Sequence, residues 1–177
     1  MKFKNTIAGM IIGAATVAQL GCEAGNTAHQ IGKERAEQIA LKELLNSYLV
    51  GAALEMDLDR QVYRLSVQNG EEARRVTIDV ATGRLLEVKD VTDKLREAMA
   101  QEENVPEPVS LSHRDAAEYA ATQAFPGTVR KWKAQRENGR LVFKFNIVNE
   151  SGEEKRVTVE ARSQKILETT MVAQDHR

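Results

Sequence analysis

The sequence contains few of the residues that usually build reactive or cross-linked sites. Its 177 residues include one Cys, three His and three Pro, and aromatic types make up only 5%. One Cys cannot form an internal disulfide, and no cluster of Cys and His offers the ligands of a structural zinc site. The charges nearly cancel, with 25 basic and 26 acidic residues, so no electrostatic field for binding nucleic acid is expected.

Apolar residues, in contrast, are abundant enough for a folded core. Hydrophobic types make up 42% of the chain, and the mean hydropathy is -0.43. This fraction is too high for a disordered chain, and Val, Leu, Ile and Ala supply what the scarce aromatics do not. The length allows one domain or two small ones.

The start of the chain, up to Cys22, has the pattern of an export signal. Lys2 and Lys4 form a short positive region, and the apolar run that follows, residues 7–18, carries no charge. At about 1.5 Å per residue this run is too short to span a bilayer core of ~30 Å. It has the length of a signal-peptide core instead, so we predict that residues 1–22 are a signal peptide.

The single cysteine, Cys22, lies at the end of this segment. Together with Gly21 directly before it, Cys22 resembles a bacterial lipobox, although Gln19 stands where an aliphatic residue is usual. The resemblance implies a diacylglyceryl group on the Cys22 sulfur and cleavage before this residue. Ordinary cleavage, for instance after Ala18 or after Ala24, is the alternative.

With either cleavage, we expect the mature chain to work outside the cytoplasm, in the periplasm or cell envelope. Residues 23–30 are small and polar and are interpreted as a tether. If Cys22 is acylated, this tether keeps the folded part close to a membrane. No later stretch is apolar enough to span one.

Two segments of the remaining chain resemble each other at a fixed offset. Residues 76–88 (VTIDVATGRLLEV) align with residues 157–169 (VTVEARSQKILET), with identical Val, Thr, Leu and Glu. Ahead of them, residues 70–76 (GEEARRV) resemble residues 152–157 (GEEKRV). The fixed offset predicts that one unit has been duplicated.

Each copy begins with the pattern of an amphipathic helix. Apolar residues recur at three-to-four spacing, which places them on one face. In the second copy Ser112 is the predicted N-cap, and Pro126-Gly127 is expected to end the helix. The predicted stripes are Ala36, Ile39, Ala40, Glu43 and Leu44 in the first copy, and Ala117, Ala120, Ala121, Ala124 and Phe125 in the second.

Runs of alternating apolar and polar residues follow each helix and predict strands. Asn69-Gly70 in the first copy and Asn138-Gly139 in the second are two-residue hairpin signals. The sequence therefore predicts an α+β fold of two tandem repeats, each one helix packed on an antiparallel sheet of three or four strands.

The predicted boundaries follow from these patterns. We expect the first unit at residues 31–103, a linker at 104–108 that contains Pro106 and Pro108, and the second unit at 109–174. Units of this size have only marginally stable cores, so the two are expected to dock together.

The order of helix, hairpin and late strand resembles the PepSY family, whose late strand commonly ends in Asp-x-x-Thr-Gly before an aliphatic pair. The second copy matches more loosely, and residues 124–129 (AFPGTV) are also typical of the family. The matching residues are Asp79, Thr82, Gly83, Leu85 and Leu86 in the first copy, and Glu160, Ser163 and Gln164 in the second.

What the resemblance implies is a binding role. PepSY domains occur in propeptides of thermolysin-type metallopeptidases, in spore-germination proteins and in small secreted or membrane-anchored proteins. They are thought to bind, and in some settings to restrain, peptidases. The family has no catalytic residues, so the resemblance implies a protein that is not an enzyme and needs no cofactor.

The residues themselves offer little chemistry. His29, His113 and His176 lie in the tether, at a helix start and at the C-terminus, and none has a ligand partner at metal-binding spacing. Cys22 has no neighbouring base that would activate it as a nucleophile. No phosphate loop or dinucleotide fingerprint is present. We therefore expect no catalytic residue, no metal and no cofactor.

Two kinds of charged cluster are candidate sites. Paired carboxylates at Asp57 and Asp59, Glu71-Glu72 and Glu153-Glu154 are expected to form a salt-bridged rim, because basic pairs flank the last two. Residues 130–133 (RKWK) could form a nucleic-acid platform, but this is weak evidence on an acidic exported chain. Trp132 is expected in the core or between the units, with partner binding as the alternative.

The sequence thus predicts an exported, non-catalytic module that binds a protein partner, such as a peptidase. One route is addition of a partner's extended peptide to an exposed sheet edge. The alternative is a structural or assembly protein of the bacterial envelope without a peptidase partner. The sequence leaves the oligomeric state open.

Overall fold

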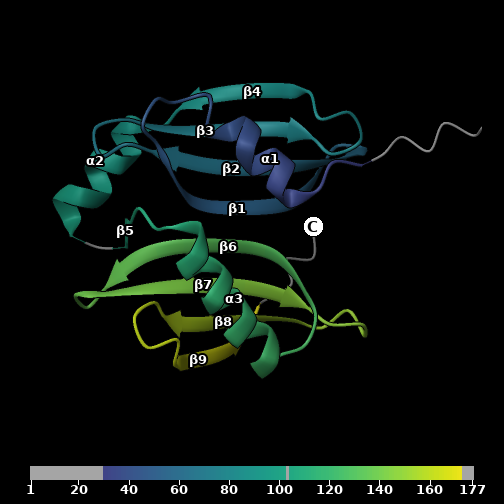
Figure 1. Cartoon of the computed structure of the whole chain (residues 1–177), viewed down its shortest axis with the longest axis vertical. Helices are drawn as coiled ribbons and strands as arrows, with labels where there is room; N and C mark the ends of the chain where they lie inside the picture. The colour runs from purple at the N-terminus through teal and green to yellow at the C-terminus, as the bar shows by residue number, and fades with distance from the viewer. Residues whose placement is uncertain (1–29, 103, 173–177) are drawn as a thin grey trace, which may run out of the picture.

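The computed structural model describes residues 30–102 and 104–172 (Figure 1). Over these residues the chain forms one antiparallel sheet of nine strands and three helices. The strands are β1 (Tyr48–Asp57), β2 (Arg60–Gln68), β3 (Ala73–Asp79), β4 (Leu85–Asp90), β5 (Val105–Pro106), β6 (Thr128–Glu137), β7 (Arg140–Val148), β8 (Glu154–Glu160) and β9 (Ile166–Met171); the helices are α1 (Lys33–Ala40), α2 (Thr92–Gln101) and α3 (Leu111–Ala124).

The α+β class is confirmed, but the prediction of two separate sheets is wrong. The strand order is β4-β3-β2-β1-β6-β7-β8-β9, so the two halves of the chain share one sheet. β1 and β6 join them, with Ala52 opposite Trp132 and Gly51 opposite Lys133. The alternating pattern of each strand could not reveal this junction, because it reports which face is buried and not which strand lies alongside.

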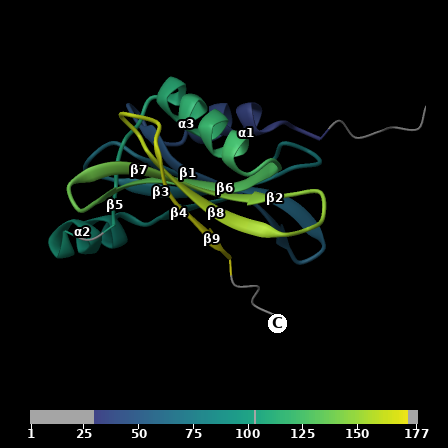
Figure 2. The same ribbon diagram turned by 90° about the horizontal axis from the view of Figure 1, so that it is seen from below.

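The helices lie in two positions relative to the sheet. Figure 2 shows α1 and α3 side by side on one face, which we call the helix face. The opposite face, called the open face below, has α2 at one end only (Figure 2). Residues 104–108, expected to be a linker, include β5, whose Val105 and Pro106 pair with Arg136 and Gln135 of β6.

A single core lies between the sheet and the two helices of the helix face. Small alanines on α1 and α3 let both helices pack closely on the sheet. The core includes Ala36, Ala40, Ala117 and Ala121 from the helices and Leu65, Val76, Ile78, Trp132, Phe143, Phe145, Val157 and Val159 from the strands of both halves.

Both helices of this face differ from their predicted bounds. α1 ends at Ala40, so Glu43 and Leu44 lie in turns, although Leu44 is still buried. α3 begins one residue before Ser112, and its N-cap is Ser110, whose hydroxyl oxygen accepts a hydrogen bond from the His113 amide at 3.4 Å. Two serines in reach of the helix start made the cap ambiguous in the sequence.

Of the two predicted two-residue hairpins, one is confirmed. Asn138 and Gly139 join β6 to β7 with φ of 48° and 74°, as this tight turn requires. The prediction at Asn69-Gly70 is wrong, because β3 begins only at Ala73. The Asn69 side-chain oxygen accepts hydrogen bonds from the amides of Glu71 and Glu72, at 3.1 and 2.9 Å, and this holds a longer loop.

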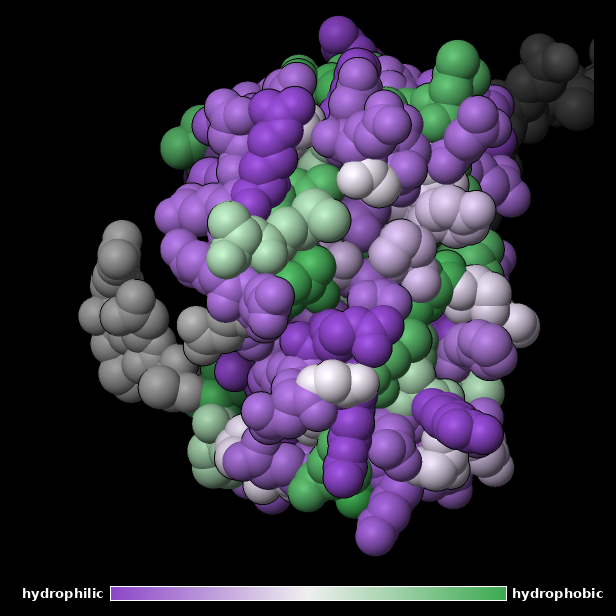
Figure 3. Space-filling model, turned by 90° about the vertical axis from the view of Figure 1, so that its left-hand side faces the viewer, coloured by the Kyte–Doolittle hydropathy of each residue, from purple (hydrophilic) through white to green (hydrophobic). Residues whose placement is uncertain are grey.

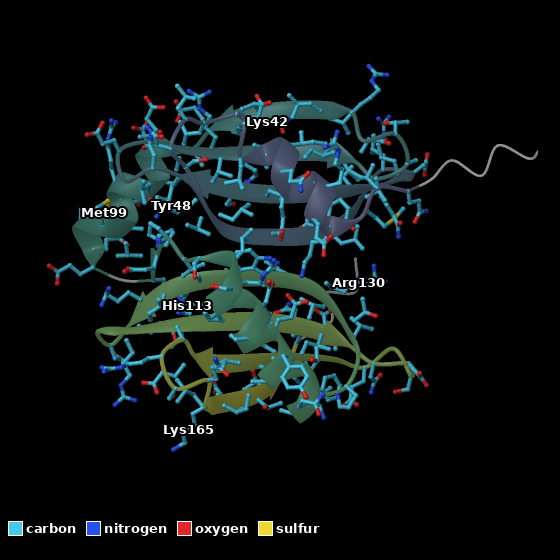
Figure 4. All side chains as sticks on the ribbon, in the orientation of Figure 1. Lys42, Tyr48, Met99, His113, Arg130 and Lys165 are labelled. Carbon is cyan, nitrogen blue, oxygen red and sulfur yellow. The ribbon has the colours of Figure 1, made fainter. Side chains whose placement is uncertain are left out.

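The side of the molecule near α2 is mainly hydrophilic. In Figure 3 hydrophobic residues form small groups among hydrophilic ones. Tyr48 and Met99, both labelled on this side in Figure 4, are about half exposed, at 53% and 51%. None of the helices described for residues 30–102 and 104–172 is long and apolar enough to cross a membrane.

Candidate functional site

No candidate metal site is formed within the described part of the chain. Residues 30–102 and 104–172 contain no group of three or more His, Cys, Asp and Glu that could hold a metal ion. His113 is exposed in the first turn of α3 (Figure 4). Cys22, His29 and His176 lie outside the described residues, so lipidation of Cys22 stays a prediction.

The residues that carry the family motif form the turn between β3 and β4. The Asp79 carboxylate accepts hydrogen bonds from the Thr82 amide and the Thr82 hydroxyl, both at 2.7 Å. These bonds stabilise the charged form, and the hydroxyl contact is the main cause that lowers the pKa of Asp79. Gly83 follows with φ of 70°, and its amide donates to the Asp79 carbonyl at 2.8 Å. The motif is thus a turn-forming device.

The same turn recurs between β8 and β9. The Ser163 hydroxyl donates to the Glu160 carboxylate, and the Gln164 amide donates to the Glu160 carbonyl at 2.8 Å. Gln164 takes the place of the glycine and adopts φ of 57°, a left-handed conformation that is unfavourable for a residue with a side chain. The looser match of the second copy therefore preserves the hydroxyl–carboxylate bond and the backbone bond of the turn, and it differs in the glycine and in the bond from the Thr82 amide.

The basic cluster at residues 130–133 is divided between the two faces of the sheet. Trp132 is buried, at 1% exposure, and its ring lies 6.5 Å from that of Phe143 and 5.4 Å from the Arg114 guanidinium. This confirms the prediction of a core position. Strand alternation turns Lys131 and Lys133 away from Trp132 and toward the open face. The cluster therefore forms no stacking platform around Trp132.

An ion-pair network links α1 to α3 and was not predicted. The Arg114 guanidinium contacts the Glu37 carboxylate at 2.8 Å, and the Lys33 ammonium contacts the Glu118 carboxylate at 2.7 Å. The side chains of Arg114 and Glu37 are only 4% and 3% exposed. The offset between the two copies aligns Lys33 with Arg114 and Glu37 with Glu118. The repeat in the sequence therefore contained a base and an acid at equivalent positions of both helices, which could have indicated the network.

The network forms the floor of a groove between the two helices. Leu41, Leu111 and Tyr119 contribute to its walls, and Tyr119 is 68% exposed. The lining carries two bases, Lys33 and Arg114, and four acids, Glu34, Glu37, Asp115 and Glu118, so its formal net charge is -2. Three of the four acids are paired with Lys33 or Arg114, and the buried pair of Arg114 and Glu37 primarily holds the two halves together.

The acidic pairs behave as the sequence predicted, at the points where contacts are present. Glu72 contacts Arg74 at 3.4 Å, and Glu153 contacts Lys155 at 3.1 Å. Asp57 lies 3.8 Å from Arg64. These contacts link one carboxylate of each pair to a neighbouring base, so the salt-bridged rim expected from the sequence is formed in part.

The two outer strands, β4 and β9, each have one neighbour in the sheet and leave one edge unpaired. β4 carries Glu87, Lys89 and Asp90, charges of the kind that discourage further strand pairing. β9 carries one charge, Glu168, and its exposed residues include Leu167 and Met171. The edge of β9 is therefore the less protected of the two.

Comparisons with known proteins give the family. The sequence matches the PepSY family model, described as "Peptidase propeptide and YPEB domain", at residues 30–89 and 114–170. PepSY domains are propeptide-like regulatory modules of peptidases. A search of curated proteins found none that matches this chain.

Two solved structures resemble this chain at low sequence identity. The crystal structure of a candidate lipoprotein from Clostridium difficile 630 has the same fold, with a TM-score of 0.53 and 18% identity, covering 81% of this chain and 95% of that one. The C-terminal domain of Bacillus megaterium YpeB is also 18% identical, with a TM-score of 0.32 and coverage of 81% and 64%. Since the two segments matched by the family model make up more than half of the sequence, the chain belongs to the PepSY family and carries the domain in tandem.

Proposed function

We propose that this protein is an exported, non-catalytic module that binds a peptidase of the cell envelope or its surroundings and regulates it. The PepSY family supports the regulatory part, since its domains are related to peptidase propeptides. The layout that we propose is two repeats, each with one helix on its own half of the shared sheet. Their bounds are residues 31–103 and 109–174, joined by the segment 104–108.

The proposal includes the route to the envelope. Residues 1–22 act as the signal peptide, and residues 23–30 are the tether. Cys22 carries a lipid that holds the protein at a membrane. The position of Cys22 behind the uncharged run of residues 7–18 supports this part.

The open edge of β9 is the observation that carries the binding function. The Val172 amide donates to the Glu154 carbonyl at 3.1 Å, so alternation directs the amides of Thr169 and Met171 away from β8. These amides can donate to an extended partner segment that joins the sheet as a further strand. The low charge of β9 leaves this approach unhindered.

Photo-crosslinking in intact cells tests the proposal. A photo-reactive residue replaces Met171 on β9 in the full-length chain, and a matched one replaces Leu85 on β4, since both side chains are exposed. We expect capture and mass spectrometry to recover one peptidase from the β9 position and to recover much less from β4. The same digest reports whether the N-terminus is an acylated Cys22.

Proline substitutions on the two edges test the route by strand addition. Thr169→Pro removes an outward amide of β9 and should lower the peptidase yield several-fold, because one backbone hydrogen bond contributes about 0.5–1.5 kcal/mol. Val88→Pro removes the matching outward amide of β4 and should leave the yield unchanged. Equal yields from both variants would refute strand addition. Recovery of only this protein itself would favour a structural role in the envelope.

A further inference from the structure

The open face of the sheet carries two rows of side chains that cross the strands and are rich in bases. The pairing register lines up directly opposed residues from β3 to β8. One row is Arg75, Ser66, Gly51, Lys133, Lys144 and Thr158; the other is Thr77, Arg64, Ala53, Lys131, Asn146 and Arg156.

These six strands contribute six bases and no acid to the two rows, which we call the basic rows. Acidic residues continue them only on the outer strands, as Glu87 beside Thr77 and Glu168 beside Thr158. The whole sequence has a net charge of -1. Positive charge is therefore concentrated in these two rows, although Glu55, Glu137 and Glu154 contact residues of the rows from neighbouring positions.

Most of these bases lack a carboxylate partner. Arg64 contacts Glu55 at 2.5 Å, and Lys144 contacts Glu137 at 2.5 Å. Within residues 30–102 and 104–172, Arg75, Lys131, Lys133 and Arg156 have no acidic group within the 4.0 Å of an ion pair. Four charges on one face thus remain free to attract an anionic group.

This arrangement costs stability. Lys133 lies directly opposite Lys144, and like charges at opposed positions of a sheet destabilise the pairing. Burial is the main cause that lowers the pKa of Lys133, and the nearby Lys144, Arg156 and Lys131 lower it further. Glu137 offsets part of this repulsion, and a carboxylate of a bound partner would offset more of it.

The centre of the basic rows is hollow, because β1 places small residues there. Gly51, Ala53 and Ser66 form the floor, and four bases, Arg64, Arg75, Lys131 and Lys133, lie around them with one acid, Glu55. Glu55 is paired with Arg64, so three of these bases remain without a carboxylate partner among the described residues. A side chain at position 51 would meet the Trp132 carbonyl at 3.0 Å, so the tight approach of β6 favours glycine. The hollow is therefore fixed by the junction between the two halves.

The shape favours a polypeptide over a lipid surface. Lys133 and Lys144 are only partly exposed, with 18% exposure for the Lys144 side chain. The carboxylate of a flexible side chain can enter the hollow and reach these ammonium groups. A flat layer of lipid headgroups would contact only the groups that project furthest.

We propose that the basic rows bind an acidic segment of a protein partner, laid across the strands. From β3 to β8 the rows extend over about 24 Å, at ~4.8 Å between neighbouring strands. An extended segment of about seven residues has this length. This surface is separate from the β9 edge. It binds a partner through side-chain charge, whereas the β9 edge binds through backbone amides. The proposal therefore does not depend on the partner being a peptidase.

Fluorescence anisotropy with a labelled heptaglutamate peptide and the full chain tests the proposal. We expect saturable binding that weakens as salt is added, since exposed charges are screened. Lys131→Gln/Lys133→Gln should lower the affinity by about ten-fold, equivalent to ~1.4 kcal/mol. The matched control is Arg35→Gln/Lys42→Gln, which removes the same charge from exposed positions of α1 and the turn after it and should retain the affinity.

Two further measurements separate the alternatives. Lys133→Gln alone should raise the melting temperature while weakening binding, which misfolding cannot produce. Equal losses in the paired variant and its control would overturn the proposal, because the attraction would then be non-specific. Binding to phosphatidylglycerol vesicles that heptaglutamate does not displace, with no peptide binding, would assign the face to a membrane and equally overturn it.

Discussion

Single residues at the two motif turns provide a matched test of backbone strain. Gly83 and Gln164 hold equivalent left-handed positions, with φ of 70° and 57°. Gln164→Gly should stabilise the protein by about 0.5–1 kcal/mol, because a side chain at this φ costs energy that glycine avoids. Gly83→Ala should destabilise it by about 1 kcal/mol or more, and its new Cβ would meet Ile31 at 3.1 Å.

Urea unfolding of the three proteins measures both effects. The two substitutions lie in turns outside the strands that carry the basic rows, so peptide binding by the folded protein should not change. Stabilisation by Gly83→Ala, or destabilisation by Gln164→Gly, would show that the φ of these turns does not control their energy.

The sequence revealed these residues well, because they are local. Asp79, Thr82 and Gly83 lie within one turn, and their types dictate its hydrogen bonds. The same locality explains why Asn138-Gly139 was predicted correctly. The hairpin prediction failed at Asn69-Gly70, because the side-chain oxygen of Asn69 accepts hydrogen bonds from two amides and so stabilises a longer loop instead of the tight turn.

At the scale of elements, breaking each of the two ion pairs between α1 and α3 should lower the free energy of unfolding by different amounts. Glu37→Gln removes the buried partner of Arg114, which keeps Asp115 at 2.7 Å and Glu118 at 3.8 Å, so the cost should be below the ~3–5 kcal/mol of a wholly unpaired buried charge. Lys33→Gln breaks a more exposed pair and should cost under about 1 kcal/mol. Denaturant unfolding at neutral pH measures both variants.

A double substitution tests the physical reason. Glu37→Leu/Arg114→Met removes both buried charges and should recover much of the stability lost in Glu37→Gln, because neither variant side chain needs a partner. A loss equal to the sum of the losses in Glu37→Leu alone and Arg114→Met alone would mean that the two charges are not coupled.

Elements were predictable in kind and order, and less so in their ends and neighbours. Alternation located the strands and the alanine stripes located the helices, since both depend on which face is buried. The pairing of β1 with β6 and the contact of Glu37 with Arg114 join residues that lie far apart in the sequence. Within one sequence, only the repeat offset carried information about such distant contacts.

The whole molecule should unfold in one step. The core cluster contains residues of both halves, and β1 pairs with β2 on one side and β6 on the other. Ala53→Pro in this central strand should therefore lower hydrogen-exchange protection in β8 as well as in β2. Thr169→Pro, on the outer strand, serves as the control and should affect β9 alone.

Exchange of β8 amides at the wild-type rate in Ala53→Pro would show that the halves are independent. In that case the basic rows, which cross the junction, would have no fixed geometry. If the two halves unfold together, they stay paired whenever the protein is folded. Arg75 of one half and Lys133 of the other then keep fixed relative positions.

The position where Ala52 faces Trp132 has one more consequence. It lies at the centre of the junction, where the equivalent strands of the two copies meet. In a symmetric homodimer of a single unit, the residue at this position would face its own copy. Two Trp side chains would overfill the space, and two Ala side chains would leave a cavity. Fusion into one chain removes that restriction. The large Trp132 ring can then lie on one side because the opposed residue is the small Ala52. The tandem protein therefore has a packed centre that two identical subunits could not form.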